Sequence, residues 1–189
     1  MQVLVAQMED VMTEASEQQR TRWAAELFTR SGVTLSIRLV ERTDKPLIED
    51  FFRHVGADDL RFRFLTTIRQ VDEKRINALC IVDIPRMVTF AAFRGDLLIA
   101  LATLAGDPET GKAEVAMATR PEWKHQGVSW TLLEHVIRFA RECGYSEILS
   151  VEKADNEGAL QVERDMGFNL RLVGDDASEF VATKVILQD

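Results

Sequence analysis

The sequence has few cysteines, no long apolar run and no secretion signal. Cys80 and Cys143 are its only cysteines, and neither has metal-ligand spacing around it. The N-terminal residues MQVLVAQMED lack a basic start and turn acidic after a very short apolar run, unlike a signal peptide. No apolar run approaches the roughly 20 residues that cross a bilayer. We therefore expect a cytoplasmic protein with no metal and no membrane contact.

Positive charge is also scarce. The chain has 23 lysines and arginines against 31 aspartates and glutamates, which gives a formal net charge of -8. This balance works against a phosphate backbone as partner and suits a cationic substrate, so we expect no nucleic acid to bind. Hydrophobic residues make up 46% of the 189 residues, which is enough to fill the core of one domain.

The first thirty residues differ in character from the rest. They predict a helical N-terminal extension over residues 1–30, with Ser31-Gly32 as its stop, ahead of a single domain over residues 31–189. So many apolar side chains must be covered, either by the chain's own domain or in a homodimer formed through the N-terminal helix. These side chains are Leu4, Met8, Val11, Met12, Trp23, Leu27 and Phe28.

From residue 33 on, strand and helix patterns follow one another. Their order predicts an α/β (α+β) fold with a central sheet and a right-handed parallel strand–helix–strand unit near residue 127. The expected elements are a strand in VTLSIRLV, a helix from Asp44, a helix over 71–79, antiparallel strands over 86–93, 97–104 and 112–119, a helix from Gly127, a strand over 147–151, a helix over 156–166, and strands around 168–173 and 180–187.

The stretch RPEWKHQGVSWTLLEHVIRFA places a lone glycine between a short basic run and a long helix. The apolar stripe of this helix is Leu132, Leu133, Val136, Ile137 and Ala140. Gly127 therefore lies at the helix N-terminus, where unpaired backbone N–H groups and the positive end of the helix dipole attract an anion. The stretch is a candidate phosphate cradle, and the alternative is that Gly127 merely starts the helix.

Two motifs of the sequence resemble the GNAT superfamily of N-acetyltransferases. They are KAEVAMATRPEWKHQGVSWTLLEHVIRFARECGYSEI and DNEGALQVERDMGF, and the resemblance covers roughly Val33 to Leu187. Within the superfamily, LSIRLVERTDKPLIEDFFRHVGADDLRFRF and the AEVA strand look like the acyltransferase domain of bacterial protein lysine acetyltransferases, whose known targets include acyl-CoA synthetases. The resemblance implies a GNAT-like fold, acetyl-CoA as cosubstrate and a lysine amine as acceptor. Its mixed central sheet should have about six or seven strands flanked by helices.

The resemblance also implies where acetyl-CoA binds. The family's loop, Q/R-x-x-G-x-G/A, falls on residues 124–129. Lys124 at its first position keeps a cation but loses planar donors, and Ser129 at its last position keeps the backbone N–H. We expect the pyrophosphate at this loop and the pantetheine along the preceding strand. The candidate residues are Val115, Ala116, Met117, Ala118, Lys124, His125, Gln126, Gly127, Val128, Ser129, Trp130 and Asn156.

The reaction also asks for a base. A lysine amine has an unperturbed pKa of about 10.4 and must be neutral to attack a thioester, so a base within hydrogen-bond or one-water reach helps. Glu114 is the candidate, because in the resembling enzymes the glutamate of the AEVA context is the general base. The alternative is a solvated carboxylate on a half-buried strand. Glu109, in the GDPETG turn, is a weaker rival.

Other reactive side chains are given structural roles. Many GNAT enzymes use a tyrosine before the Gly-Phe ending to protonate the leaving thiolate, but Glu163 stands there and no tyrosine acid is available. Cys143 closes a helix without a basic partner and is expected to be a core thiol. His54 and His135 are expected on the surface, each on the polar side or at the end of a helix.

Two classes of function remain open. The first is an acyltransferase that acts on a protein lysine by direct attack in a ternary complex, with a small-molecule amine as the alternative acceptor. The second is a non-catalytic acyl-CoA-binding sensor domain. Glu114 and the overall acidity favour the enzyme.

Overall fold

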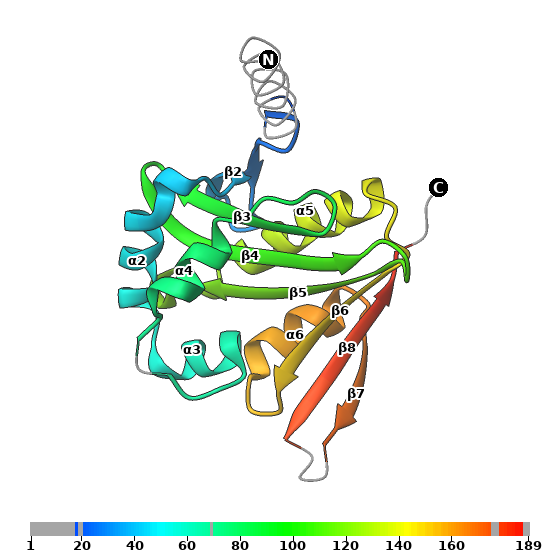
Figure 1. Ribbon diagram of the computed structural model, residues 1–189. Helices are drawn as coiled ribbons and strands as arrows, with labels where there is room; N and C mark the ends of the chain where they lie inside the picture. The colour runs from blue at the N-terminus through cyan, green and yellow to red at the C-terminus, as the bar shows by residue number, and fades with distance from the viewer. Residues whose placement is uncertain (1–17, 19–20, 69, 175–177, 187–189) are drawn as a thin grey trace.

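The computed structural model describes residues 18, 21–68, 70–174 and 178–186 (Figure 1). Its centre is an eight-stranded sheet in the order β1-β2-β3-β4-β5-β6-β8-β7. The strands are β1 Ala25–Phe28, β2 Thr34–Leu39, β3 Met87–Arg94, β4 Leu97–Asp107, β5 Lys112–Thr119, β6 Glu147–Lys153, β7 Asn169–Val173 and β8 Glu179–Val185. The helices are α2 Lys45–His54, α3 Ala57–Phe64, α4 Glu73–Leu79, α5 Val128–Glu142 and α6 Glu157–Asp165, with short 3-10 turns at Arg42–Asp44 and Pro121–Trp123.

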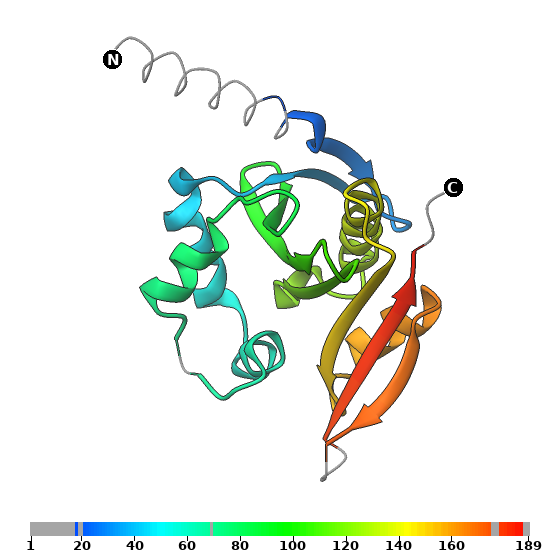
Figure 2. The same ribbon diagram turned by 45° about the vertical axis from the view of Figure 1, so that its right-hand side comes forward.

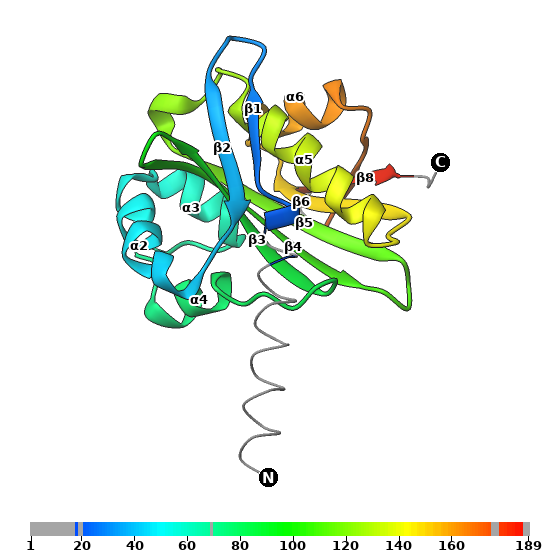
Figure 3. The ribbon, with the colours of Figure 1, turned by 90° about the horizontal axis from the view of Figure 1, so that it is seen from above.

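Helices cover both faces of the sheet, as Figures 1 and 3 show. On one face α5 buries Leu132, Val136 and Phe139 against the strands. On the other face α2 and α4 bury side chains such as Phe51 and Leu79. Because both faces are covered, the central strand β4 is apolar along most of its length and does not alternate. None of the helices in the described ranges is long and apolar enough to cross a bilayer.

The β5–α5–β6 unit positions the site. The two strands run parallel, as predicted, while every other neighbouring pair in the sheet is antiparallel. They pair only between residues 112–114 and 147–149, and beyond these residues they separate. Figure 2 shows β6, β8 and β7 inclined away from β4 and β5. The sheet is therefore open along one edge of β5.

The sheet begins earlier than the sequence predicted. Residues 25–28, expected at the end of a helix, form β1, which pairs antiparallel with β2. This strand explains why the expected six or seven strands became eight. The sequence AELF has half-buried and exposed residues in alternation, a period of two that the helical spacing of Trp23 and Leu27 concealed. The predicted helical residues Leu4, Met8, Val11 and Met12 lie outside the described residues, as does any homodimer formed through them.

His135 is buried, so its expected surface position was wrong. It is only 2% exposed and packs edge-on against Trp23 and Phe90. Its Nε2 lies 3.0 Å from the carbonyl oxygen of Trp23, and the guanidinium of Arg138 donates to Nδ1 at 2.9 Å. Burial, followed by the Arg138 charge, lowers the pKa of His135 to about 4. Trp23, in the segment before β1, covers this side of α5. The spacing of apolar residues along α5 does not reveal this contact. His54 is exposed, as expected.

Candidate active site

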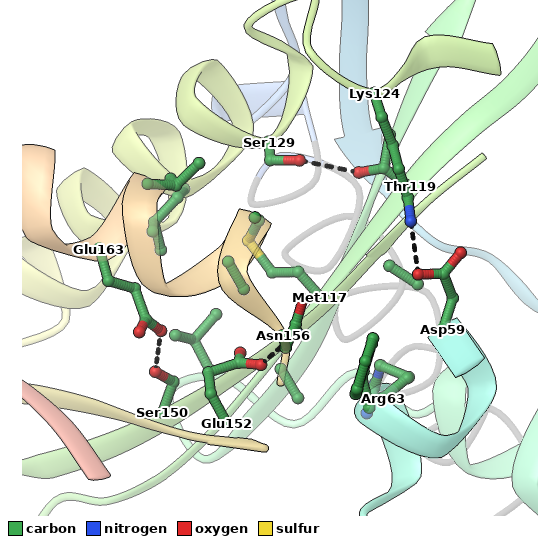
Figure 4. Close-up of a pocket in the computed structure, with 18 of the residues that line it drawn as sticks. Asp59, Arg63, Met117, Thr119, Lys124, Ser129, Ser150, Glu152, Asn156 and Glu163 are labelled. Atoms are coloured by element: carbon green, nitrogen blue, oxygen red, sulfur yellow. Dashed lines mark hydrogen bonds and ion pairs between the residues drawn. The ribbon is translucent and has the colours of Figure 1, made fainter. Parts of the chain in front are cut away.

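A cavity of about 450 Å³ lies where β5 and β6 separate. One wall is β5, and the opposite wall is formed by β6 and α6 (Figure 4). The C-terminal half of α3 closes a third side, and the loop that enters α5 closes one end. Strand divergence thus turns a continuous sheet into a cleft that an extended ligand chain can enter.

The β5 wall carries Glu114 next to small and apolar side chains. Glu114 is exposed, whereas Val115 and Ala118 are buried. The β4 edge of β5 is fully paired, for example Glu114 with Ala105 and Met117 with Ala102. From Val115 on, the opposite edge of β5 has no strand partner among the described residues. Its outward-facing backbone groups can therefore pair with the amides of a bound ligand.

The loop before α5 presents an uncapped helix N-terminus to the cavity. Gly127 is the N-cap residue, has a φ of 77°, and no side chain caps the helix there. A Cβ atom on Gly127 would lie 3.2 Å from the Cβ of Thr29, so both backbone strain and space favour glycine. The free N–H groups at the start of α5 are available to an anion. The residues present therefore fit the pyrophosphate of a CoA thioester.

Two contacts fix this loop in place. The hydroxyl groups of Ser129 and Thr119 lie 3.0 Å apart and tie α5 to the end of β5. Ser31, in the turn after β1, donates its hydroxyl hydrogen to the carbonyl oxygen of Gln126 at 2.6 Å. The turn between β1 and β2 thus supports the cradle from outside, which connects the early part of the chain to the site.

Lys124 points into the cavity but already has a partner. Its Nζ lies 2.5 Å from the Asp59 carboxylate on α3, as Figure 4 shows. This ion pair joins the loop to α3 and uses part of the charge that was expected to face a phosphate. The free backbone N–H groups, and not this lysine alone, therefore make the loop suitable for an anion.

The β6–α6 wall carries two carboxyls in a poorly solvated setting. Asn156 donates its side-chain N–H to Glu152 at 2.6 Å, and Ser150 donates its hydroxyl hydrogen to Glu163. Burial, and then the negative charge of Glu163, raises the pKa of Glu152 to about 8 against the opposing effects of Asn156 and Arg63. Burial likewise raises the pKa of Glu163 to about 7. At neutral pH this wall therefore holds protons.

Arg63, at the end of α3, provides a deeply placed positive charge. Its guanidinium donates to the hydroxyl of Thr103 at 2.7 Å. Its Nε is buried and has no hydrogen-bond partner in the described part of the chain. Burial lowers the pKa of Arg63 to about 10, although the charges of Glu114 and Glu152 oppose this shift. Arg63 therefore stays cationic between the two acidic walls.

The structure brings nearly all of the predicted site residues together. Glu114, Val115–Ala118, Asn156 and the loop residues line the cavity, and Gln126 is the exception. The side chain of Gln126 donates to the carbonyl oxygen of Glu122 instead. Glu109, the rival base, lies exposed in the turn between β4 and β5 and is not among the lining residues.

Sequence reasoning missed Ser150 and Glu152. A signal existed for both, because EILSVEK places them on the same strand face as the buried Ile148. Polar residues in such positions are uncommon unless they have partners or a function. Arg63 belongs to the segment 61–64, which resembles the family's segment near the acceptor entrance. A short strand or turn was the alternative for this segment, and the structure has the helix α3 there.

Comparison with known proteins agrees with this geometry. The acetyltransferase PA5475 of Pseudomonas aeruginosa is 24% identical over 154 residues, which are 79% of this chain and 83% of that protein. The GNAT domain of S. lividans PAT superposes with a TM-score of 0.81 at 22% identity and covers 87% of this chain and 97% of that one. An acetyltransferase from Salmonella typhimurium, solved with its cofactor acetyl-CoA, gives 0.62 at 16% identity, with 82% and 95% covered.

These solved structures share the fold. Family membership is shown by a direct match of residues 55–168, more than half of the chain, to the family described as Acetyltransferase (GNAT) family. The chain therefore belongs to the GNAT family of acetyltransferases, enzymes that take their acetyl group from acetyl-CoA.

Proposed function

We propose that this acetyltransferase transfers the acetyl group of acetyl-CoA to a lysine amine of a protein, by direct attack with both substrates bound. The observation that carries the proposal is one continuous cavity, which joins the helix N-terminus at Gly127 to the Glu114 carboxylate along the open edge of β5. The resemblance of the AEVA strand and the α2–α3 segment to bacterial protein lysine acetyltransferases supports a protein lysine, including one on an acyl-CoA synthetase, as acceptor.

Backbone groups hold the cosubstrate in this proposal. The N–H groups at the start of α5, from Gln126 to Trp130, bind the pyrophosphate, and residues 115–118 of β5 pair with the pantetheine. Asn156 lines the same channel from the opposite wall. Acetyl-CoA supplies an acyl group already activated as a thioester. Backbone recognition also explains why serine at position 129 is compatible with binding.

Glu114 is the catalytic base. Its carboxylate is exposed and lines the cavity, so an incoming amine can reach it directly or through one water. It accepts the proton of the lysine ammonium and leaves a neutral nucleophile beside the acyl carbon. Arg63 lines the same cavity, and its positive charge interacts with the Glu114 carboxylate.

Mass spectrometry tests the proposal. The chain is incubated with acetyl-CoA and, in separate reactions, with folded acyl-CoA synthetases, other cytosolic proteins and polyamines, and Glu114→Gln serves as the control. We expect acetylation of particular lysines of a folded protein, at a rate well above that of the control. Acetylation of polyamines alone would replace the protein lysine by a small amine. No acetylation above the control in any reaction would favour the sensor domain.

A further inference from the structure

The β6–α6 wall contains two carboxyl groups to which the proposed reaction assigns no role. Glu152, near the end of β6, and Glu163, on α6, both line the cavity from this wall (Figure 4). Glu163 is 4% exposed, and its Oε2 is buried without a hydrogen-bond partner in the described part of the chain. An unpartnered oxygen in such a position costs free energy, so a purely structural role does not explain it.

The two carboxyls form one unit with defined supports. Asn156, the residue before α6, donates to Glu152 Oε2 at 2.6 Å, and Oε1 has no donor in the described part of the chain. Ser150 on β6 donates to Glu163 Oε1. The charged groups that face Glu152 are Glu163 from α6, Arg63 from α3 and, across the cavity, Glu114 from β5. Only Arg63 is cationic, and it is shared with Glu114.

This arrangement keeps a proton on the wall opposite the base. Burial and the neighbouring Glu163 together raise the pKa of Glu152 to about 8, close to the value of about 8.5 for an ordinary alkyl thiol. A carboxyl whose pKa is close to that of the thiol can protonate a leaving thiolate near neutral pH and recover its proton afterwards. Paired groups whose surroundings separate their protonation states are typical of acid–base partners in enzymes.

We propose that Glu152 is the general acid that protonates the leaving thiolate, and that Glu163 is the positioning residue that keeps Glu152 protonated. This role rests on the proposed function, because it requires an acyl thioester between the two walls. The proposal goes further than a base on β5, since it makes catalysis depend on carboxyls from both walls of the cavity.

The proton balance closes. Glu114 first takes the ammonium proton and releases it to solvent. The neutral amine nitrogen then forms its bond to the acyl carbon while Glu114 accepts a second proton from that nitrogen. The carbon–sulfur bond breaks with its electron pair on sulfur, and Glu152 gives its proton to this sulfur, which leaves as the CoA thiol. Glu114 is then protonated and Glu152 ionised, so one proton must return to Glu152 and one must leave Glu114. Exchange with solvent through the open cavity mouth achieves both.

The first test is kinetic and uses an acceptor on which the parent chain is active. Glu152→Gln keeps the size of the side chain and the contact with Asn156 but has no acidic proton. We expect kcat to fall by about 10²-fold while KM for acetyl-CoA stays within about twofold. The parent kcat should fall as pH rises above about 8, and this alkaline limb should disappear in the variant. Glu157→Gln, an exposed glutamate on α6, is the matched control and should keep both kcat and the limb.

Glu163→Gln separates positioning from chemistry. Without the negative charge beside it, Glu152 loses its proton at lower pH. The alkaline limb of kcat should therefore move to lower pH, while the maximal rate on the acidic side stays close to that of the parent. A purely structural role of Glu163 would lower kcat at every pH and leave the limb in place, and this result would overturn the positioning role.

The second test needs no turnover. Carbon-13 NMR of the protein labelled at glutamate carboxyls should show one carboxyl titrating near pH 8, and its signal should be absent in Glu152→Gln. If turnover is normal but no glutamate titrates above about pH 6, the role of Glu152 is overturned and the proposed function stands. If KM rises in Glu152→Gln while kcat is unchanged, Glu152 only binds the cosubstrate. If no acceptor is acetylated at all, the proposed function fails, and the acid role fails with it.

Discussion

The two walls of the cavity place the same side chain in opposite surroundings. On β5, Glu114 is exposed and water can solvate its carboxylate. On the facing wall, Glu152 is half-buried, Glu163 is buried beside it, and the pKa of both is raised. The difference in burial matches the roles proposed for the two walls, in which a glutamate accepts a proton on one wall and donates one on the other.

The division follows from how the sheet splits. β5 stays paired with β4, so its side chains at the open edge border the cavity mouth. β6 pairs with β8 and is covered by α6, so polar groups on its inner face are enclosed. The strands β5 and β6 separate after three residue pairs, and this separation creates two different walls. We call them the wet wall, which is β5 with Glu114, and the dry wall, which is β6 and α6 with Glu152 and Glu163.

The largest expected effect comes from the wet wall. Glu114→Gln keeps the shape of the side chain and removes its basicity, so kcat should fall by about 10²-fold or more. Binding of acetyl-CoA, measured by calorimetry, should be unchanged because backbone groups hold it. The residual rate should rise with pH as hydroxide takes over part of the deprotonation. Near-normal turnover at neutral pH would show that the base lies elsewhere.

A smaller but still large effect is expected at the end of the β5 wall. Gly127→Glu puts a side chain into a backbone with a φ of 77°, close to Thr29, and adds a negative charge where the pyrophosphate should bind. The Kd of acetyl-CoA should rise about 10-fold or more. Gly95→Glu in the β3–β4 hairpin is the control, because Gly95 also has a positive φ, of 58°, but lies outside the cavity. Equal Kd values for the two variants would reject the phosphate cradle.

The wet wall could be predicted from the sequence, whereas the dry wall could not. The motif around Gly127 and the AEVA strand are local patterns that resemble the GNAT family, and this resemblance singled out Glu114 and the loop, which line one cavity. Strand spacing puts Glu152 on the same face as the buried Ile148, but its setting beside Glu163 arises only when α6 folds over β6. That event depends on contacts between distant segments, which periodicity does not report.

The remaining errors have the same origin. Residues 25–28 have spacing compatible with a helix or a strand, and pairing with β2 decides for the strand. His135 lies on the side of α5 that sequence spacing assigns to solvent, and the segment around Trp23 buries it. In both cases contacts between distant segments decide the structure, and the local spacing of apolar residues does not report such contacts.

The dry wall should also affect the stability of the folded protein. The pKa of Glu163 is about 7 when folded against an unperturbed 4.5, so the unfolded chain binds fewer protons between these values. The free energy of unfolding therefore falls as pH rises through this window. Glu163→Gln should lack this loss. From about pH 5 to about pH 7, the unfolding free energy of the variant should therefore rise by about 2 kcal/mol relative to that of the parent. Urea unfolding of both proteins at pH 5 and pH 7 measures this change in unfolding free energy. An equal change in the parent and the variant would contradict the burial of the Glu163 carboxyl.

The smallest effect is expected at His135, which lies on the opposite face of the sheet from α2 and α4. Burial here lowers the pKa of a base, so the unfolding free energy rises with pH instead of falling. The folded pKa of about 4 lies below the unperturbed 6.5, so the unfolded chain binds more protons between them. The stabilising contribution of neutral His135 is complete above about pH 6.5 and is lost as pH falls toward 4. From about pH 6.5 to about pH 5.5, the parent should lose about 1 kcal/mol of unfolding free energy that His135→Gln retains. The exposed His54→Gln should behave like the parent. If His135→Gln and His54→Gln lose stability equally, the ring is not held neutral, and the contacts with Trp23 and Arg138 do not have the energetic role that the structure assigns to them.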